Sequence, residues 1–424
     1  MKRESTRLGQ AEALEVIESL RKGIPPKRYT SHYTSGTEDF LNKVRHFHLD
    51  SPSGRGKIRF VSGSWGSGKT HFLRLLREEA FDANFLVSTV ELNADSTPFN
   101  KFEQVFYDIV RNITSPEMYR EGHLDHAAPF GEVLQRALVS SSAAAEGVVS
   151  HERLQDAKER LFAAEGIDID FRRVTAQYWE TLLAEGADPA TLEDQRGRLL
   201  QWFAGEGTVG HYRKLGIQKV VNRANARLML QSLSRLVTHL GYKGLVILFD
   251  EAEMTFSTMR KSNLKQAHNN LLHLINSIDE TEGLFLIYAT TPDFYMDERH
   301  GITIYGALAQ RIGRPEDRPP RPLDRVWNLD SVESALDDFL NAACKIRAIY
   351  ATAYPECAEV VPAEGQLRDY AKKLMEAHPE FSRVSRWRVL VTGTVEVLDA
   401  RVQGGELPTA EQLHEDIMEK LKNL

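Results

Sequence analysis

The fold follows from one stretch, Gly63-Ser64-Trp65-Gly66-Ser67-Gly68-Lys69-Thr70. It fits the pattern G-x-x-x-x-G-K-[ST] at every fixed position, which is the pattern of a phosphate-binding loop, or P-loop. Glycines let backbone N–H groups turn inward around phosphates without a Cβ clash. Lys69 supplies a mobile charge for the β- and γ-phosphates, and Thr70 offers a hydroxyl to Mg²⁺. We therefore predict that this stretch and the adjoining His71 bind ATP-Mg²⁺; the alternative is a glycine-rich turn with a surface lysine.

The segments around the loop have the periodicities that a P-loop requires. A short β-rich run, Ile58–Val61, precedes it, and His71–Ala80 follows with helical spacing of its apolar residues, so that a helix dipole points at the phosphates. Three further apolar runs alternate with helical segments: Phe85–Leu92, Leu245–Phe249 and Leu284–Ala289. Strands that are apolar throughout and alternate with helices indicate a parallel sheet covered on both faces. The predicted fold is α/β, with a three-layer P-loop NTPase core.

The chain divides into four predicted parts. Residues 1–112 form the N-terminal part of the ATPase core, and residues 113–225, which lack β-rich runs, form a helical insertion. Residues 226–325 complete the core. The proline-rich segment Arg314–Asp324 marks the boundary to a C-terminal helical lid, residues 326–424.

An acidic pair follows the most apolar strand. Asp250 and Glu251 come directly after Leu245–Phe249. In open α/β sheets ligands collect at the carboxyl ends of the strands, so Asp250 is expected beside the P-loop, where it would hold Mg²⁺ with Thr70. Glu251 is expected to polarise the attacking water, with Lys69 stabilising the transferred phosphate. The alternative is a strand that ends in a solvated acidic turn.

Residues at three further places in the chain are candidates for sensing or stabilising the γ-phosphate. Thr290, and less strongly Thr291, ends the strand Leu284–Ala289, where the alternative role is strand-end capping. Arg311 follows that strand and could reach a neighbouring subunit's nucleotide; the alternative is a surface arginine. Arg383, with Arg386 as second choice, could report from the lid, and a structural role is the equally weighted alternative.

Composition excludes several classes of protein. Hydrophobic residues at 42% and charged residues at 27% are ordinary for a globular chain, and no apolar run reaches the ~20 residues of a membrane span. The N-terminus lacks the apolar stretch of a signal peptide. The chain has only two cysteines, so we do not expect disulfides to hold the fold together. Both features predict a cytoplasmic location. The net charge of −7 argues against general DNA binding. One basic stretch stands out and is either a solvated linker or functional: Arg311, Arg314, Arg318, Arg321 and Arg325.

The order of these motifs resembles that of AAA+ ATPases, with a closer resemblance to the BrxC/BrxD family of BREX-system ATP-binding proteins. The resemblance spans nearly the whole chain and is closest to the shorter BrxD-type members. It rests on five stretches: Gly23–Pro26, Gly68–Leu73, Trp202–Glu206, Gly241–Leu245 and Asp250–Glu253. The bulky Ser64-Trp65 pair inside the loop departs from the pattern.

The resemblance implies an ATPase of a bacterial anti-phage defence system that acts with other defence proteins. It implies ATP and Mg²⁺ as cofactors, places Tyr33 near the adenine, and makes the helical insertion a partner-binding surface or passive bulk. A homo-oligomer with Arg311 acting in trans is a further implication. Two other hypotheses stay open: a nucleotide-gated scaffold that recruits effectors without significant turnover, and an ATPase that loads onto DNA.

Overall fold

The computed structural model describes residues 8–51, 54–93, 96–124, 129–141, 150–184, 188–252, 259–378, 385–405 and 407–422. Within these residues a six-stranded sheet has the order β3-β2-β4-β5-β1-β6. The strands are β1 (Lys57–Ser62), β2 (Leu86–Glu91), β3 (Ile113–Thr114), β4 (Leu245–Asp250), β5 (Leu284–Thr290) and β6 (Val326–Asn328). All pairs are parallel except the short β2–β3 pair. The carboxyl ends of β1, β4 and β5 therefore share one edge of the sheet.

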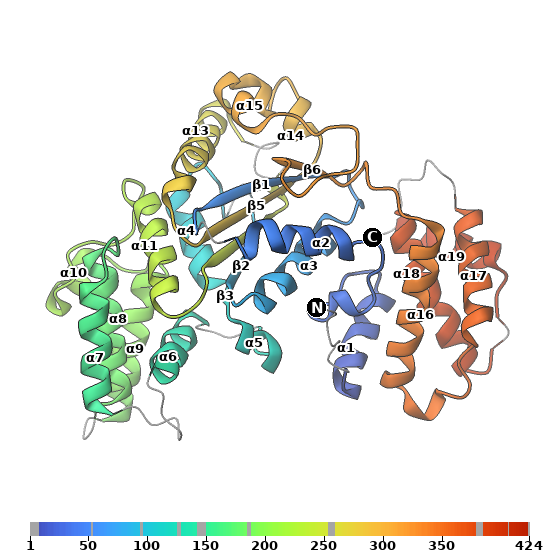
Figure 1. The fold of residues 1–424 in the computed structure, drawn as a ribbon, viewed down its shortest axis with the longest axis horizontal. Coiled ribbons are helices and arrows are strands. Elements are labelled where there is room, and N and C mark those ends of the chain that lie inside the picture. The colour runs from blue at the N-terminus through green and yellow to red at the C-terminus, as the bar shows by residue number, and fades with distance from the viewer. Residues whose placement is uncertain are drawn as a thin grey trace.

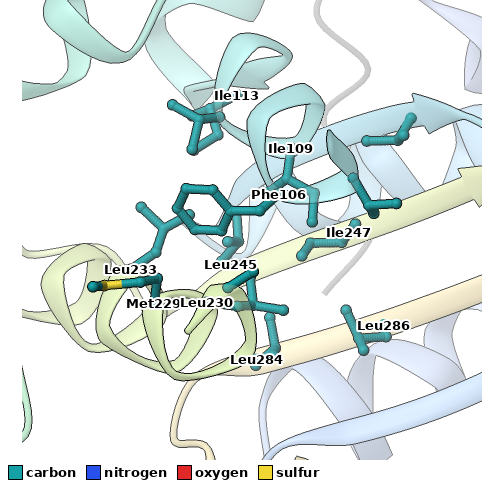
Figure 2. Close-up of a cluster of buried hydrophobic side chains, with 14 of the residues drawn as sticks. Phe106, Ile109, Ile113, Met229, Leu230, Leu233, Leu245, Ile247, Leu284 and Leu286 are labelled. Atoms are coloured by element: carbon teal, nitrogen blue, oxygen red, sulfur yellow. The ribbon is translucent and has the colours of Figure 1, made fainter. Parts of the chain in front are cut away.

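The strands are apolar on both sides because helices cover both faces of the sheet. Figure 2 shows one face, where side chains of β4 and β5 such as Ile247 and Leu286 pack against Phe106, Ile109 and Leu233. These come from α4 (Phe102–Arg111) and α11 (Ala226–His239). On the opposite face, the alternate residues of the strands pack against α2 (Glu38–Val44) and α3 (Lys69–Asp82). This gives the three-layer arrangement expected from the sequence.

A group of helices extends the first face on one side of the sheet (Figure 1). It comprises α6 (Pro129–Ser141), α7 (His151–Ala163), α8 (Ile169–Leu182), α9 (Pro189–Phe203), α10 (Val209–Tyr212) and the 3₁₀ turn η3 (Arg213–Leu215). Between β3 and this group, α5 (Pro116–Glu121) lies beside α3, and its Tyr119 belongs to the core of the opposite face. The apolar side chains of the group, including Phe171 and Trp202, belong to the same core cluster as the sheet face. The insertion is thus packed onto the core rather than tethered to it.

A second helical group lies at the other side of the molecule (Figure 1). It contains α16 (Leu336–Ala353), η6 (Pro355–Cys357), α17 (Glu364–Ala377), α18 (Arg386–Val402) and α19 (Ala410–Lys422). The N-terminal helix α1 (Gln10–Arg21) packs against α16 and α18, with Ala13, Val16, Ile17 and Leu20 in their shared core. Arg21 also forms a two-pronged ion pair with Asp399 of α18. The two ends of the described chain are therefore held together.

The remaining elements connect these layers. They are η1 (Thr30–His32), η2 (Arg45–Leu49), α13 (Lys261–Ser277), η4 (Ile278–Glu280), α14 (Asp293–Met296), η5 (Ile302–Ile304) and α15 (Gly306–Ile312). None of the described helices is long and apolar enough to cross a bilayer.

The main strands and helices begin and end within a few residues of the predicted bounds, but two short strands were not predicted. Ile113–Thr114 forms β3 at the start of the segment expected to be purely helical, and it makes the sheet mostly rather than wholly parallel. Val326–Asn328 forms β6 beside β1. Runs of two and three residues are too short for a period-2 pattern to be recognised, so only tertiary pairing reveals them.

The sheet face in Figure 2 makes a stability prediction possible. Ile247 is 0% exposed, so Ile247→Ala is expected to leave a cavity and lower the free energy of unfolding by about 2–5 kcal/mol. Urea unfolding measures this. Leu228→Ala on α11, where the side chain is 65% exposed, is the control and is expected to change stability by no more than about 0.5 kcal/mol. Equal effects of the two changes would contradict the assignment of this core.

Candidate functional site

The P-loop joins the end of β1 to the start of α3, and its glycines are required by its geometry. Gly68, at the N-cap of α3, has φ +91°, a left-handed conformation that disfavours side chains. A Cβ on Gly63 would lie 2.2 Å from Oγ of Ser67, so only glycine fits. The N–H of Gly63 donates to the carbonyl of Thr290 at 3.1 Å, which fixes the loop's first residue to β5. The N-terminus of α3 then faces the concave side of the loop.

Lys69 is folded back onto the loop that precedes it. Its Nζ donates to the carbonyl oxygens of Gly63 and Ser64 at 2.9 and 3.3 Å. The same Nζ lies 5.4 Å from the centre of the Trp65 ring, and Trp65 is 64% exposed. These partners are uncharged carbonyl oxygens and an aromatic ring, and an anionic phosphate would be a stronger partner for an ammonium group. Lys69 is thus held ready at the loop.

Thr70 and Asp250 meet directly although they are 180 residues apart in the chain. The Thr70 hydroxyl donates to Oδ2 of Asp250 at 2.8 Å. Asp250 is the last residue of β4 and is only 5% exposed. A hydroxyl and a carboxylate side by side at a P-loop are the oxygen ligands that a Mg²⁺ site of this class uses. The donor set fits the metal that the sequence implies.

Glu251 has an uncommon backbone conformation. Its φ is +52°, the left-handed region that non-glycine residues rarely adopt, and its N–H donates to Oδ1 of Asp250 at 2.9 Å. Such strain is concentrated at functional sites. Partial burial raises the pKa of the Glu251 carboxyl above its ordinary value, and the charges of Asp250 and Glu91 add to the shift. A carboxyl held this way is a better proton acceptor than an ordinary surface glutamate.

Two hydroxyl groups near this edge are buried without a partner. Oγ1 of Thr290, 0% exposed at the end of β5, and Oγ of Ser67 in the loop have no hydrogen-bond acceptor or donor among the described residues. Thr291 is also buried, at 4% exposed. Buried unpaired hydroxyls are costly, and a bound ligand or water is the usual reason for them. They are a second observation that fits a phosphate-bearing ligand here.

His71 anchors the start of α3 to the N-terminal segment. Thr34 donates its hydroxyl to the carbonyl of Thr30, so it must accept from Nε2–H of His71, 2.9 Å away. This leaves Nδ1 of His71 to accept from the Tyr33 hydroxyl at 3.0 Å. Burial lowers the pKa of His71 to about 4, which agrees with a neutral ring. Tyr33 is 4% exposed and packs beside α1 and α16, so its contact with a nucleotide base stays a prediction.

Asp330 contacts the P-loop although no sequence motif pointed to it. Its carboxylate accepts from the Ser64 N–H at 2.9 and 3.0 Å and from the Ser64 hydroxyl at 2.8 Å. It lies between β6 and α16, in the segment that leads to the C-terminal helices. The loop and those helices are therefore linked through one side chain. A single aspartate in an irregular segment gives no signal that sequence alone could have used.

A cavity of about 480 Å³ opens on the side of Thr70 and Asp250 that faces β2 and β3. Its lining includes Glu91, the partner of Asp250 in the β2–β4 register, and Arg74. Burial lowers the pKa of Arg74, whose guanidinium donates to the carbonyl of Pro25. The metal-side wall of the site is therefore polar and accessible.

The arginine candidates lie away from this edge. Arg311, at the end of α15, is exposed and lines a pocket beside the first residues of β1, at the opposite edge of the sheet. Arg386 begins α18, with its guanidinium 5.1 Å from the ring centre of Phe339. Arg383 lies outside the described residues. The structure thus brings together residues 63–71 with Asp250, Glu251 and Thr290, but it does not bring Arg311 to them.

The neutral state of His71 gives a pH prediction. The unfolded chain takes up a proton near the ordinary His value of 6.5, whereas the folded chain does so only near pH 4. Stability is therefore lost as the pH falls from about 6.5 to 4. His71→Gln removes this contribution, so the drop in the free energy of unfolding between pH 7 and pH 5 is expected to be smaller than in the wild type. Exposed His46→Gln is the control; a drop unchanged by His71→Gln would contradict the assignment.

Comparisons with known proteins agree with this geometry. No curated protein matches the chain well enough to count as a relative. The family described as BREX system ATP-binding protein BrxC/D matches residues 8–416 of this chain. That match includes the P-loop, the acidic pair, the insertion and nearly all of the C-terminal helices. The chain therefore belongs to the BrxC/D family of BREX system ATP-binding proteins.

Proposed function

We propose that the chain binds ATP with Mg²⁺ and hydrolyses it as a component of a bacterial anti-phage defence system. The observation that carries the proposal is the 2.8 Å contact between Thr70 and Asp250, which joins the two motifs at one edge of the sheet. The family's description supports the nucleotide and the BREX setting. Bound Mg²⁺ would supply charge stabilisation at the phosphates, held by Thr70 and Asp250.

The chain's own residues divide the remaining work. Lys69 exchanges its carbonyl contacts for phosphate oxygens, and the N–H groups of the loop surround the anion. Glu251 orients the attacking water and takes its proton, a role that its raised pKa favours. Thr290 offers its unpaired hydroxyl to the γ-phosphate or to that water. Glu251 is also the reason to prefer turnover over a scaffold that only binds ATP.

The switch that we propose is of AAA+ type. The C-terminal helices act as the lid, with Asp330 as their contact to the loop and Arg383 or Arg386 as sensor. Arg311 is exposed and far from its own P-loop, so it could reach a nucleotide bound at a P-loop only in another subunit. Other BREX proteins are the proposed partners, with the insertion as a contact surface. DNA as a target is the weaker proposal, given the net charge of −7.

Glu251→Gln tests turnover. It is expected to keep ATP binding within about twofold and to lower the rate of phosphate release by about 10²-fold or more, because general-base catalysis contributes at least that much. Phosphate release and nucleotide binding are measured on the same preparations. Lys69→Ala should lose binding, and Glu356→Gln, an exposed change, should alter neither. If the wild type releases no phosphate, even with DNA and partner proteins added, the scaffold hypothesis replaces this one.

Asp330→Ala tests the contact between the loop and the lid segment. Without the carboxylate the Ser64 N–H loses its acceptor and the first turn of the loop is less well ordered, so ATP binding is expected to weaken about tenfold. Asp330→Asn keeps one acceptor oxygen, so its affinity for ATP should lie between those of the wild type and Asp330→Ala. Exposed Asp337→Ala, in the first turn of α16, is the control. Unchanged or tighter binding in Asp330→Ala would show that the contact does not order the loop.

A further inference from the structure

A second polar pocket lies at the edge of the sheet opposite the P-loop. It has a volume of about 310 Å³ and is bounded by the start of β1, the end of α13 with η4, the end of α15 and the residues before β6. The five residue steps from Ile58 to Gly63, at the rise of a strand, place the two edges roughly 17 Å apart. The pocket is therefore separate from the site described above.

Four cationic side chains line this pocket: Lys57, Arg59, Arg311 and Arg325. Asp279 is the one carboxylate among its lining residues. Within the described parts of the chain, none of the four cations forms an ion pair with a carboxylate. Their hydrogen bonds go to main-chain oxygens: Lys57 to Phe47 and His48, Arg59 to Ile58, and Arg325 to Arg311. The pocket thus holds an excess of positive charge.

Two of the four cations, Lys57 and Arg59, are partly buried, whereas Arg311 and Arg325 are exposed. Burial, with the charge of Arg325, lowers the pKa of Arg59 to about 10. Burial and the charge of Arg59 lower the pKa of Lys57, and burial lowers the pKa of His48 to about 4, with Arg59 and Lys57 adding to the shift. Nε of Arg59 is buried without a hydrogen-bond partner in the described structure. Asp324 lies near Arg59 but is already held by two hydrogen bonds from Arg318, at 2.8 and 3.1 Å.

The wall of the pocket is rigid where Gly56 meets η4. A Cβ on Gly56 would lie 2.1 Å from the carbonyl oxygen of Ile278, so the start of β1 is pressed against this turn. His48 is held by a 2.7 Å contact between its Nε2 and the carbonyl of Pro322 and stacks on Phe285, 5.2 Å between ring centres. The part of β1 that carries Lys57 and Arg59 is therefore held in place. Partly buried cations without a paired carboxylate are unfavourable, and a bound anion would reduce that cost.

We propose that this pocket binds the phosphate groups of a small anion, with Arg59 at its base and Lys57, Arg311 and Arg325 around it. One guanidinium group can bind two phosphate oxygens at once. The pocket's volume is near the lower end for ligand pockets, so it fits one or two phosphate groups and few other atoms. A compact group of cations suits the terminal phosphates of a nucleotide or an oligophosphate. A phosphodiester backbone, which needs an extended groove, fits it less well.

Inorganic pyrophosphate is the probe, titrated calorimetrically into the full chain carrying Lys69→Ala, so that the P-loop does not take it up. One binding event per chain is expected, and Arg59→Met in the same background should weaken it at least tenfold. Arg314→Gln changes an exposed arginine that lies between Arg311 and Arg325 in the chain but outside the pocket. It is the matched control and should bind pyrophosphate as before. Because the P-loop is disabled throughout, the result is independent of whether the chain hydrolyses ATP.

Folding is monitored in the same series. Arg59→Met is expected to unfold at an equal or higher urea concentration without pyrophosphate, because it removes an uncompensated charge. If Arg59→Met fails to fold, Lys57→Gln and Arg325→Gln replace it, each expected to weaken binding several-fold. Absence of pyrophosphate binding, or binding that none of these changes affects, overturns the proposal. So does a short single-stranded oligonucleotide that binds through Arg59 when pyrophosphate does not.

Discussion

The contact between Thr70 and Asp250 is the interaction on which the organisation of this chain depends. The two residues stand at the ends of motifs carried by β1 and β4, which are not neighbours: β5 lies between them. Only a parallel arrangement puts the carboxyl ends of all three strands at one edge, and such a sheet is covered by helices on both faces. The core in Figure 2 is therefore what holds a hydroxyl and a carboxylate 2.8 Å apart. The chain between the two motifs can carry the helical insertion because the insertion packs onto the sheet face that α4 and α11 cover.

Sequence predicted those parts of the fold in which local pattern and tertiary role coincide. The P-loop and the strand before Asp250 carry their roles in residue type and spacing, so that their positions followed from general rules of α/β sheets. β3 and β6 carry no such pattern, and they are set by the strands beside them. Asp330 was missed for a related reason. Its importance arises from the Ser64 backbone it meets, 266 residues away, and no property of its own neighbours indicates that meeting.

The N-terminal helix shows how far apolar spacing reaches and where it ends. Apolar residues recur at helical spacing over residues 8–22, at Leu8, Ala11, Leu14, Ile17 and Leu20, and α1 is present at Gln10–Arg21. The buried residues, however, are Ala13, Val16, Ile17 and Leu20, whereas Leu8, Ala11 and Leu14 are less buried. Which face is covered depends on the partners, α16 and α18, which come more than 300 residues later. This packing, with the hydrogen bonds from His71 to Tyr33 and Thr34, connects α3, the helix that follows the P-loop, to the C-terminal group. The P-loop edge is therefore connected to that group in two ways, through His71 and the N-terminal segment and through Asp330 in the segment before α16.

The basic stretch before β6 illustrates why charge alone was ambiguous in the sequence. Its five arginines looked alike, yet the fold divides them: Arg318 is neutralised by Asp324 and Glu316, whereas Arg311 and Arg325 turn to a pocket where Lys57 and Arg59 already lie. Three of the four cations of that pocket are close to β1 or β6, the strand pair whose other end carries the P-loop and Asp330. A ligand in this pocket would contact residues in or next to the same two strands that position Ser64 and Asp330. The strand pair β1–β6 is thus a direct physical connection between the two edges, because the two backbones pair from Phe60 and Val326 to Ser62 and Asn328.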